Sequence, residues 1–67
     1  MFATGDRIEL VRMGEDPDPI SPGEQGEVLM CTTYTHGGVT YTQVAVKWDC
    51  GRSVSVVLPV DRIRKVL

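Results

Sequence analysis

The sequence predicts an all-β domain of five short strands, and three observations lead to this prediction. Apolar and polar residues alternate with a period of two along most of the chain, which is the pattern of half-buried strands. Glycine and proline separate the alternating segments, and these residues mark turns and loops. The chain has 67 residues and a mass of 7.4 kDa, which is enough for one domain with a small core.

The first strand is expected over residues 6–13, where Ile8 and Leu10 alternate with charged side chains. A long loop follows over residues 14–24, because three prolines and two glycines in that stretch exclude both a helix and a central strand. Proline also confines the residue before it to extended conformations, so we expect this loop to be stiff.

A hairpin is expected next. Its strands cover residues 25–35 and 39–48, and the second of them is rich in β-branched and aromatic residues, which favour strands. Gly37 and Gly38 lie between the strands and supply the positive φ that a tight hairpin turn requires.

Two further elements complete the chain. A fourth strand is expected over residues 52–58, after a tight turn in which Gly51 has a positive φ. Residues 59–62 are expected to form a single helical turn, because the fixed φ of Pro59 suits the start of a helix. The last strand covers residues 63–67.

This order of elements is that of the SH3-like small barrel, in which a five-stranded sheet curls and closes and so leaves few free edges. The sequence therefore predicts one SH3-like barrel over residues 1–67. The inward positions of the alternating segments define the expected core, which comprises Ile8, Leu10, Val28, Met30, Val44, Val46, Val54, Val56 and Ile63.

Composition restricts the function. The net charge is −2 and the pI is about 5.1, whereas a nucleic-acid-binding domain usually carries a basic excess. We see neither a signal peptide nor an apolar run that could span a membrane, so a cytoplasmic location is expected. A chain of this size without a nucleophile–base pair is not expected to be an enzyme or to bind a cofactor.

Neither a metal site nor a disulfide is expected. Cys31, Cys50 and His36 fall short of the four ligands of a structural zinc site, and the acidic residues of the loop over 14–24 lack the spacing of a calcium-binding loop. Thiols stay reduced in the cytosol, so we expect two unpaired, half-buried cysteines.

Four segments carry a recognisable pattern, which consists of the spacing of their prolines and glycines together with one tryptophan–aspartate turn. They are Gly5–Met13, Asp16–Val28, Val46–Ser53 and Leu58–Ile63. These segments resemble the small bacterial and phage proteins grouped as domain of unknown function 4314. The resemblance implies an origin in a phage or another mobile genetic element, and a place in a bacterial cell or a phage-infected host. It implies no catalytic residue, because the family has no established activity. Similar sequences have a short, acidic hairpin in the place of residues 32–42. In this chain the corresponding segment is longer, uncharged and aromatic.

The first candidate site is a protein-binding surface. Residues 1–27 hold seven acidic and two basic side chains, a net charge of −5, and part of this charge lies on the proline-stiffened loop, which loses little entropy on docking. Aromatic side chains near the hairpin tip also form binding edges, although we expect Tyr41 to cover the mouth of the barrel. The predicted function is a non-catalytic module that binds a host or element protein. Its predicted contact residues are Glu15, Asp16, Asp18, Glu24, Tyr34 and His36.

The alternative is a nucleic-acid-associated barrel. Residues 28–67 hold five basic and two acidic side chains, a net charge of +3, and basic side chains attract phosphate. The pattern Pro22-Gly23-x-x-Gly26-x-Val28 also resembles the start of the KOW-type barrels of ribosomal and transcription proteins, although it is a generic turn pattern. The residues predicted for this alternative are Arg52, Arg62, Arg64 and Lys65.

Overall fold

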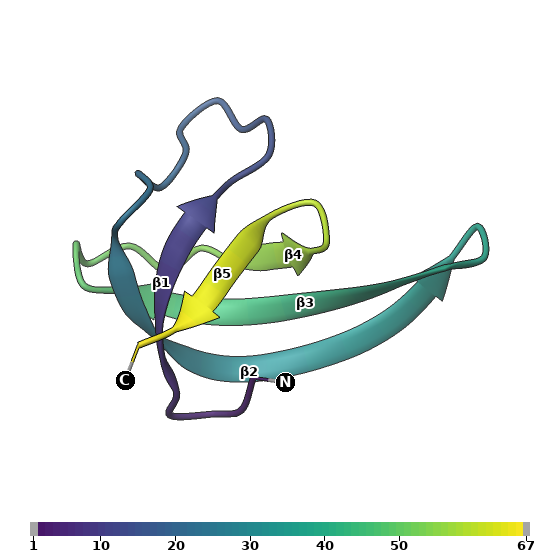
Figure 1. Ribbon diagram of the computed structural model, residues 1–67, viewed down its shortest axis with the longest axis horizontal. Coiled ribbons are helices and arrows are strands. Elements are labelled where there is room, and N and C mark those ends of the chain that lie inside the picture. Colours follow the sequence, from purple (N-terminus) through teal and green to yellow (C-terminus); the bar gives the residue numbers. More distant parts are fainter. Residues whose placement is uncertain (1, 67) are drawn as a thin grey trace.

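The computed structural model describes residues 2–66 and is all-β (Figure 1). Its strands form one antiparallel sheet in the order β4-β3-β2-β1-β5. Among the described residues there is no helix of the length and apolar character that crossing a membrane requires. The strands are β1 (Arg7–Arg12), β2 (Gln25–His36), β3 (Val39–Trp48), β4 (Val56–Leu58) and β5 (Arg62–Lys65).

The core follows from the alternation in the strands. Seven of the nine predicted core residues are buried: Ile8, Leu10, Val28, Val44, Val46, Val56 and Ile63. Two further side chains join them, since Ile20 enters from the proline-rich loop and Trp48 from the end of β3. The Trp48 indole N–H donates a hydrogen bond to the carbonyl of Val54 at 3.0 Å, and Val54 itself is half-buried against the core.

The prediction for Met30 is wrong, because its side chain is 60% exposed. Val28 pairs with Val46 and Met30 pairs with Ala45, so Leu29 is an extra residue that forms a β-bulge. A bulge places two residues opposite one on the partner strand and so interrupts the strict alternation. Met30 therefore faces outward and Cys31 packs against the core.

The connection from β4 to β5 also differs from the prediction. A turn occupies residues 59–61 in place of the expected helical turn, because β5 already begins at Arg62. The fourth strand is shorter than the expected range of 52–58, and Ser53 contributes only an isolated bridge to Lys47.

The expected closure of the sheet does not occur in the described chain, where β4 and β5 remain the two edges. Asp61 provides the physical reason. Its carboxylate accepts hydrogen bonds from the backbone N–H of Val57 at 2.8 Å and from that of Gly14 at 2.6 Å. The N–H that β4 could offer to β5 is therefore bonded to the turn.

The hairpin formed by β2 and β3 extends well beyond the rest of the sheet (Figure 1). β1 pairs with β2 only at residues 25–27, and β4 pairs with β3 only at residues 42–44. Residues 34–41, which we call the arm, therefore pair only with one another in the described chain. The tip turns at Gly37 and Gly38, whose φ values of 59° and 78° confirm the predicted turn.

Candidate functional site

The predicted acidic contact residues lie on the loop between β1 and β2, where Glu15, Asp16 and Asp18 are exposed and Glu24 is half-buried. Buried Ile20 anchors this loop to the core. Within the loop, the Asp16 carboxylate accepts a hydrogen bond from the backbone N–H of Asp18 at 2.9 Å. The loop is thus an ordered, acidic surface feature.

Arg52 ties the acidic loop to the connection between β3 and β4. Its guanidinium donates to the carbonyl of Asp18 at 2.8 Å and lies 3.4 Å from the carboxylate of the same residue. Asp18, predicted to contact a protein, and Arg52, predicted to contact nucleic acid, therefore form an ion pair with each other.

The predicted aromatic contacts lie on the arm. Tyr34 and Tyr41 are register partners, and their rings stack with centroids 5.5 Å apart. Tyr41 thus packs on Tyr34, and His36 is exposed at the end of β2, as expected.

The structure does not bring the acidic loop and the arm together. In Figure 1 the loop after β1 rises at the upper left, whereas the arm extends to the far right. The six residues predicted as one contact surface therefore form two separate regions.

The basic residues of the alternative site are also divided. Arg62, Arg64 and Lys65 follow one another on the edge strand β5, whereas Arg52 lies beside the acidic loop. Arg64 contacts Glu9 at 3.1 Å, and Lys65 lies 3.5 Å from Asp6. Three of the four predicted phosphate ligands therefore already face a carboxylate.

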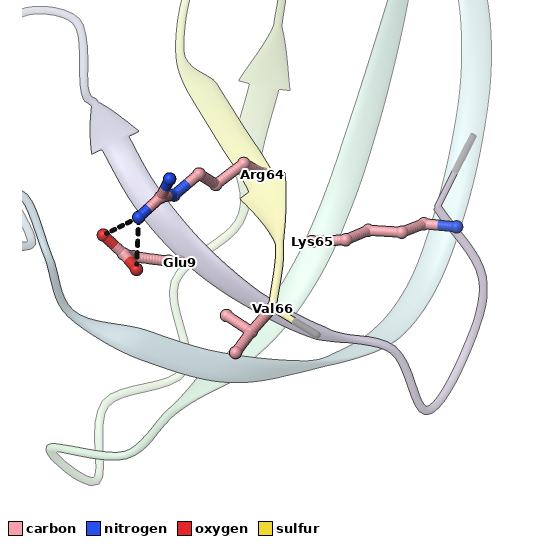
Figure 2. Close-up of a pocket in the computed structure, with 4 residues that line it drawn as sticks. All are labelled: Glu9, Arg64, Lys65 and Val66. Atoms are coloured by element: carbon pink, nitrogen blue, oxygen red, sulfur yellow. Dashed lines mark hydrogen bonds and ion pairs between the residues drawn. The ribbon is translucent and has the colours of Figure 1, made fainter.

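Figure 2 shows how β5 distributes these charges. The Arg64 guanidinium points toward both carboxylate oxygens of Glu9, and Lys65 points in the opposite direction. Together with Val66, these side chains line an open depression of about 240 Å³. The side chains of Arg64 and Lys65 thus lie on opposite sides of β5.

A surface that the sequence analysis missed lies on the outward face of β2 and β3. We call it the outer strip. Six large hydrophobic side chains are exposed in the described chain, and four of them, Leu29, Met30, Tyr34 and Val39, belong to this face. The outer strip comprises Leu29, Met30, Thr32, Tyr34 and His36 of β2 and Val39, Tyr41, Gln43 and Ala45 of β3.

The hairpin exchanges the polarity of its two faces along its length. In the body, the inward pair Val28–Val46 is buried and the outward pair Glu27–Lys47 is charged. At the base of the arm the inward pair is Thr33–Thr42. Within the arm the inward pair is Thr35–Thr40, whereas the outward pairs are Tyr34–Tyr41 and His36–Val39. The apolar side chains therefore move from the inner face to the outer face beyond the bulge at Leu29.

The outer strip is also free of formal charge. No Asp, Glu, Lys or Arg occurs between Val28 and Val46, although 24% of the chain is charged. This uncharged run is the sequence signal that could have revealed the surface. Assigning its side chains to one face requires the position of the bulge, which the sequence does not show.

Charged side chains border the outer strip at its body end. The Arg7 guanidinium donates to both carboxylate oxygens of Asp49, at 3.0 and 2.5 Å. This hydrogen bonding lowers the pKa of Asp49 and raises the pKa of Arg7. With Glu27 and Lys47, the pair lines a shallow depression of about 330 Å³. A polar border next to an apolar surface is the usual arrangement at protein interfaces.

The remaining reactive side chains form no catalytic arrangement in the described part of the chain. Cys31 is half-buried and donates to the carbonyl of Phe2, at an Sγ–O distance of 3.3 Å, and Cys50 is exposed, contrary to prediction. Both thiols are free. Within residues 2–66, no group of three or more His, Cys, Asp or Glu side chains is arranged to hold a metal ion.

The geometry thus defines a small β-sheet protein with an ordered acidic loop and an uncharged arm. The sequence model of the family described as Domain of unknown function (DUF4314) matches residues 1–66, and the chain belongs to this family. Neither the curated proteins nor the solved structures include a significant match to the chain.

Proposed function

We propose that this protein is a non-catalytic protein-binding module and that the outer strip is its principal contact surface. The observation that carries the proposal is the exchange of polarity along the hairpin. In the body the apolar face of β2 and β3 is covered by the protein's own core, but in the arm the described chain leaves the apolar face open. Exposed apolar patches with a polar border mark interaction sites.

The residue types of the outer strip fit protein recognition. Protein interfaces are enriched in tyrosine and methionine and depleted of charged residues at their centre. The side chains of Tyr34 and Met30 are 41% and 60% exposed. The Tyr34 ring is stacked on Tyr41, so its side chain has less conformational freedom to lose when a partner binds. Preorganised side chains lose less entropy on binding.

The proposal includes finer features of architecture and origin. A meander in which β5 returns to β1 is the strand order of an SH3-like barrel, and it supports an open variant of that fold. We propose that the protein acts in the cytoplasm for a phage or mobile genetic element and binds a host or element protein. The acidic loop with Glu15, Asp16 and Asp18 is a second contact, suited to a basic patch on that protein.

The nucleic-acid alternative has weaker support. Phosphate binding by Arg52, Arg64 and Lys65 would require the loss of their contacts with Asp18, Glu9 and Asp6. The outer strip itself offers tyrosines for base stacking but no cation for the phosphates, and single-strand binding normally combines both.

Affinity capture with matched variants tests the proposal. The immobilised wild-type protein and its Tyr34→Asp and Val60→Asp variants are incubated with a lysate of the encoding organism, and retained proteins are quantified. Val60 is 53% exposed and lies outside the outer strip, so its variant controls for a new charge. We expect a retained protein that is lost only with Tyr34→Asp.

A fluorescence anisotropy titration with single-stranded and duplex DNA and RNA tests the alternative. Micromolar binding in physiological salt that is lost in the Arg64→Glu variant would overturn the protein-binding proposal. Equal retention of every captured protein by the wild type and Tyr34→Asp would also contradict it.

A further inference from the structure

We infer that the outer strip is the interface of a homodimer, with β2 of each copy lying over β3 of the other. This inference rests on the proposed protein-binding function and names a second copy of the chain as the occupant of the outer strip. Its evidence lies in the charge distribution, in the register of β2 and β3, and in the size of the core.

The charge distribution favours this surface for self-association. Two copies each carry a net charge of −2, and net charge of one sign opposes association. The acidic loop, with Glu15, Asp16 and Asp18 exposed, would repel the same loop of another copy. The outer strip contains no charged residue between Val28 and Val46, so two copies can meet there without repulsion.

The register of the hairpin makes the outer strip complementary to itself. A two-fold interface requires that residue i contacts residue j and that j contacts i. A two-fold axis parallel to the strands places each β2 residue over the β3 residue that is its own register partner. Glu27 then faces Lys47 of the second copy, and Tyr34 faces Tyr41 of the second copy, because both pairs are register partners in one chain.

The electrostatic consequence of this arrangement is specific. Glu27 and Lys47 are the charged register partners that border the outer strip, and they have opposite signs. The axis parallel to the strands pairs them twice across the interface. An axis perpendicular to the strands in the plane of the interface would instead place both over the uncharged arm tip.

The size of the chain supports an additional source of stability. Nine side chains form the buried core, and domains below about 70–80 residues often depend on disulfides, metals or oligomerisation. Both cysteines of this chain are free thiols. Packing two outer strips together covers the apolar face that one copy leaves open.

The dimer should be weak. The outer strip has nine residues, and Glu27 and Lys47 bring the contact to eleven, whereas a standard interface uses about 20–30 residues on each side. We therefore expect a dissociation constant of roughly 10–500 μM, which corresponds to the small interfaces of transient complexes.

Sedimentation velocity of the purified chain, from about 5 μM to about 1 mM, tests the inference. The wild type should shift from monomer to dimer in this range. Tyr34→Asp should raise the dissociation constant at least tenfold, whereas Val60→Asp, the exposed control outside the outer strip, should leave it within twofold. Circular dichroism verifies that each variant is folded.

A charge exchange tests the arrangement of the strands. Glu27→Lys and Lys47→Glu should each weaken self-association, because each places like charges opposite one another. An equimolar mixture of the two variants should recover association, since each Lys then faces a Glu of the other copy. The doubly exchanged chain should also recover it.

Each outcome has a definite consequence. A wild type that remains monomeric to about 1 mM overturns the homodimer, and the capture experiment with Tyr34→Asp then decides the proposed function separately. A dimer that is insensitive to Tyr34→Asp overturns the assignment to the outer strip. A dimer that is sensitive to Tyr34→Asp but not recovered in the mixture overturns the arrangement of β2 over β3.

Discussion

The body of the sheet and the arm both contain β2 and β3, but their apolar side chains lie on opposite faces of these strands. In the body, β3 contributes Val44, Val46 and Trp48 to the core. In the arm and at its base, the equivalent inward positions of β3 are Thr40 and Thr42. The body uses its apolar side chains to hold the fold together, whereas the arm displays them. The difference shows that one alternating sequence can bury its apolar side chains in one half of a hairpin and expose them in the other.

The largest expected effect comes from the largest buried side chain. Trp48→Ala should destabilise the body by about 3–5 kcal/mol, because it removes the indole from the core and leaves the Val54 carbonyl without its hydrogen bond. A loss of this size would unfold much of the population. Tyr34→Ala in the arm should cost less than about 1 kcal/mol, since it loses mainly one aromatic contact. Urea denaturation compares the two, and equal midpoint shifts would contradict the distinction.

Val46 and Val39 offer the same comparison with one substitution on one strand. Val46→Ala should lower the free energy of unfolding by about 2 kcal/mol, through lost burial and a cavity, because Val46 is 1% exposed. Val39→Ala should change it by less than about 0.5 kcal/mol, because Val39 is 46% exposed. Thermal unfolding followed by circular dichroism measures both, and an unchanged midpoint for Val46→Ala would refute the assigned facing of β3.

Asp61 tests the turn that keeps the sheet open. Asp61→Ala should cost about 1–3 kcal/mol, because the N–H groups of Val57 and Gly14 both lose their acceptor. Thr35→Ala in the arm serves as the control, since the Thr35 hydroxyl is hydrogen-bonded to the exposed Thr40 hydroxyl. Hydrogen exchange at Val57 and Gly14 should accelerate in the Asp61 variant. Unchanged protection at both amides would show that these hydrogen bonds do not hold the turn.

The smallest expected effect is on pH dependence, which should come from the body because the arm has no carboxylate. The Arg7 hydrogen bond lowers the pKa of Asp49, and the Ala3 N–H together with Lys65 lowers the pKa of Asp6. Their contribution to stability is complete above the unfolded pKa of 3.8 and is lost as the pH falls through the lower folded values.

Denaturant unfolding at several pH values between about 6 and 2 measures this loss. Asp49→Asn should reduce the slope of stability against pH in the acidic part of that range. A slope identical to that of the wild type would mean that the Arg7–Asp49 pair does not contribute.

The sequence predicts the parts of this fold that depend on local periodicity. The bounds of β3 and the tip at Gly37 and Gly38 agree with the prediction, and Gly51 has the expected positive φ of 97°. Burial of Ile20 is not visible in the sequence, because a polar loop surrounds it. The bulge at Leu29 is equally hidden, since a single inserted residue leaves no distinctive composition.

The same limit applies to the candidate site. Tyr34 and His36 are candidates in the sequence because they lie beside the glycine turn, where aromatic side chains can form a binding edge, and both lie on the outer strip. The alternation alone predicts that Met30 is a core residue, and only the register of β2 and β3 shows that it faces outward. The prediction of Arg52 and Lys65 as phosphate ligands does not take their ion pairs with Asp18 and Asp6 into account. Ion pairs between distant parts of the chain depend on the tertiary fold and are not visible in the sequence.

The pairing pattern of the arm has a consequence for how this protein can evolve. Residues 34–41 pair only with one another in the described chain, so matched insertions or deletions on both sides of Gly37 and Gly38 would lengthen or shorten the arm without disturbing a buried side chain. A one-residue change beside Leu29 would instead rotate the displayed face relative to the body. The length of the arm and the direction of its outer face can thus change independently of each other, while the rest of the domain stays constant.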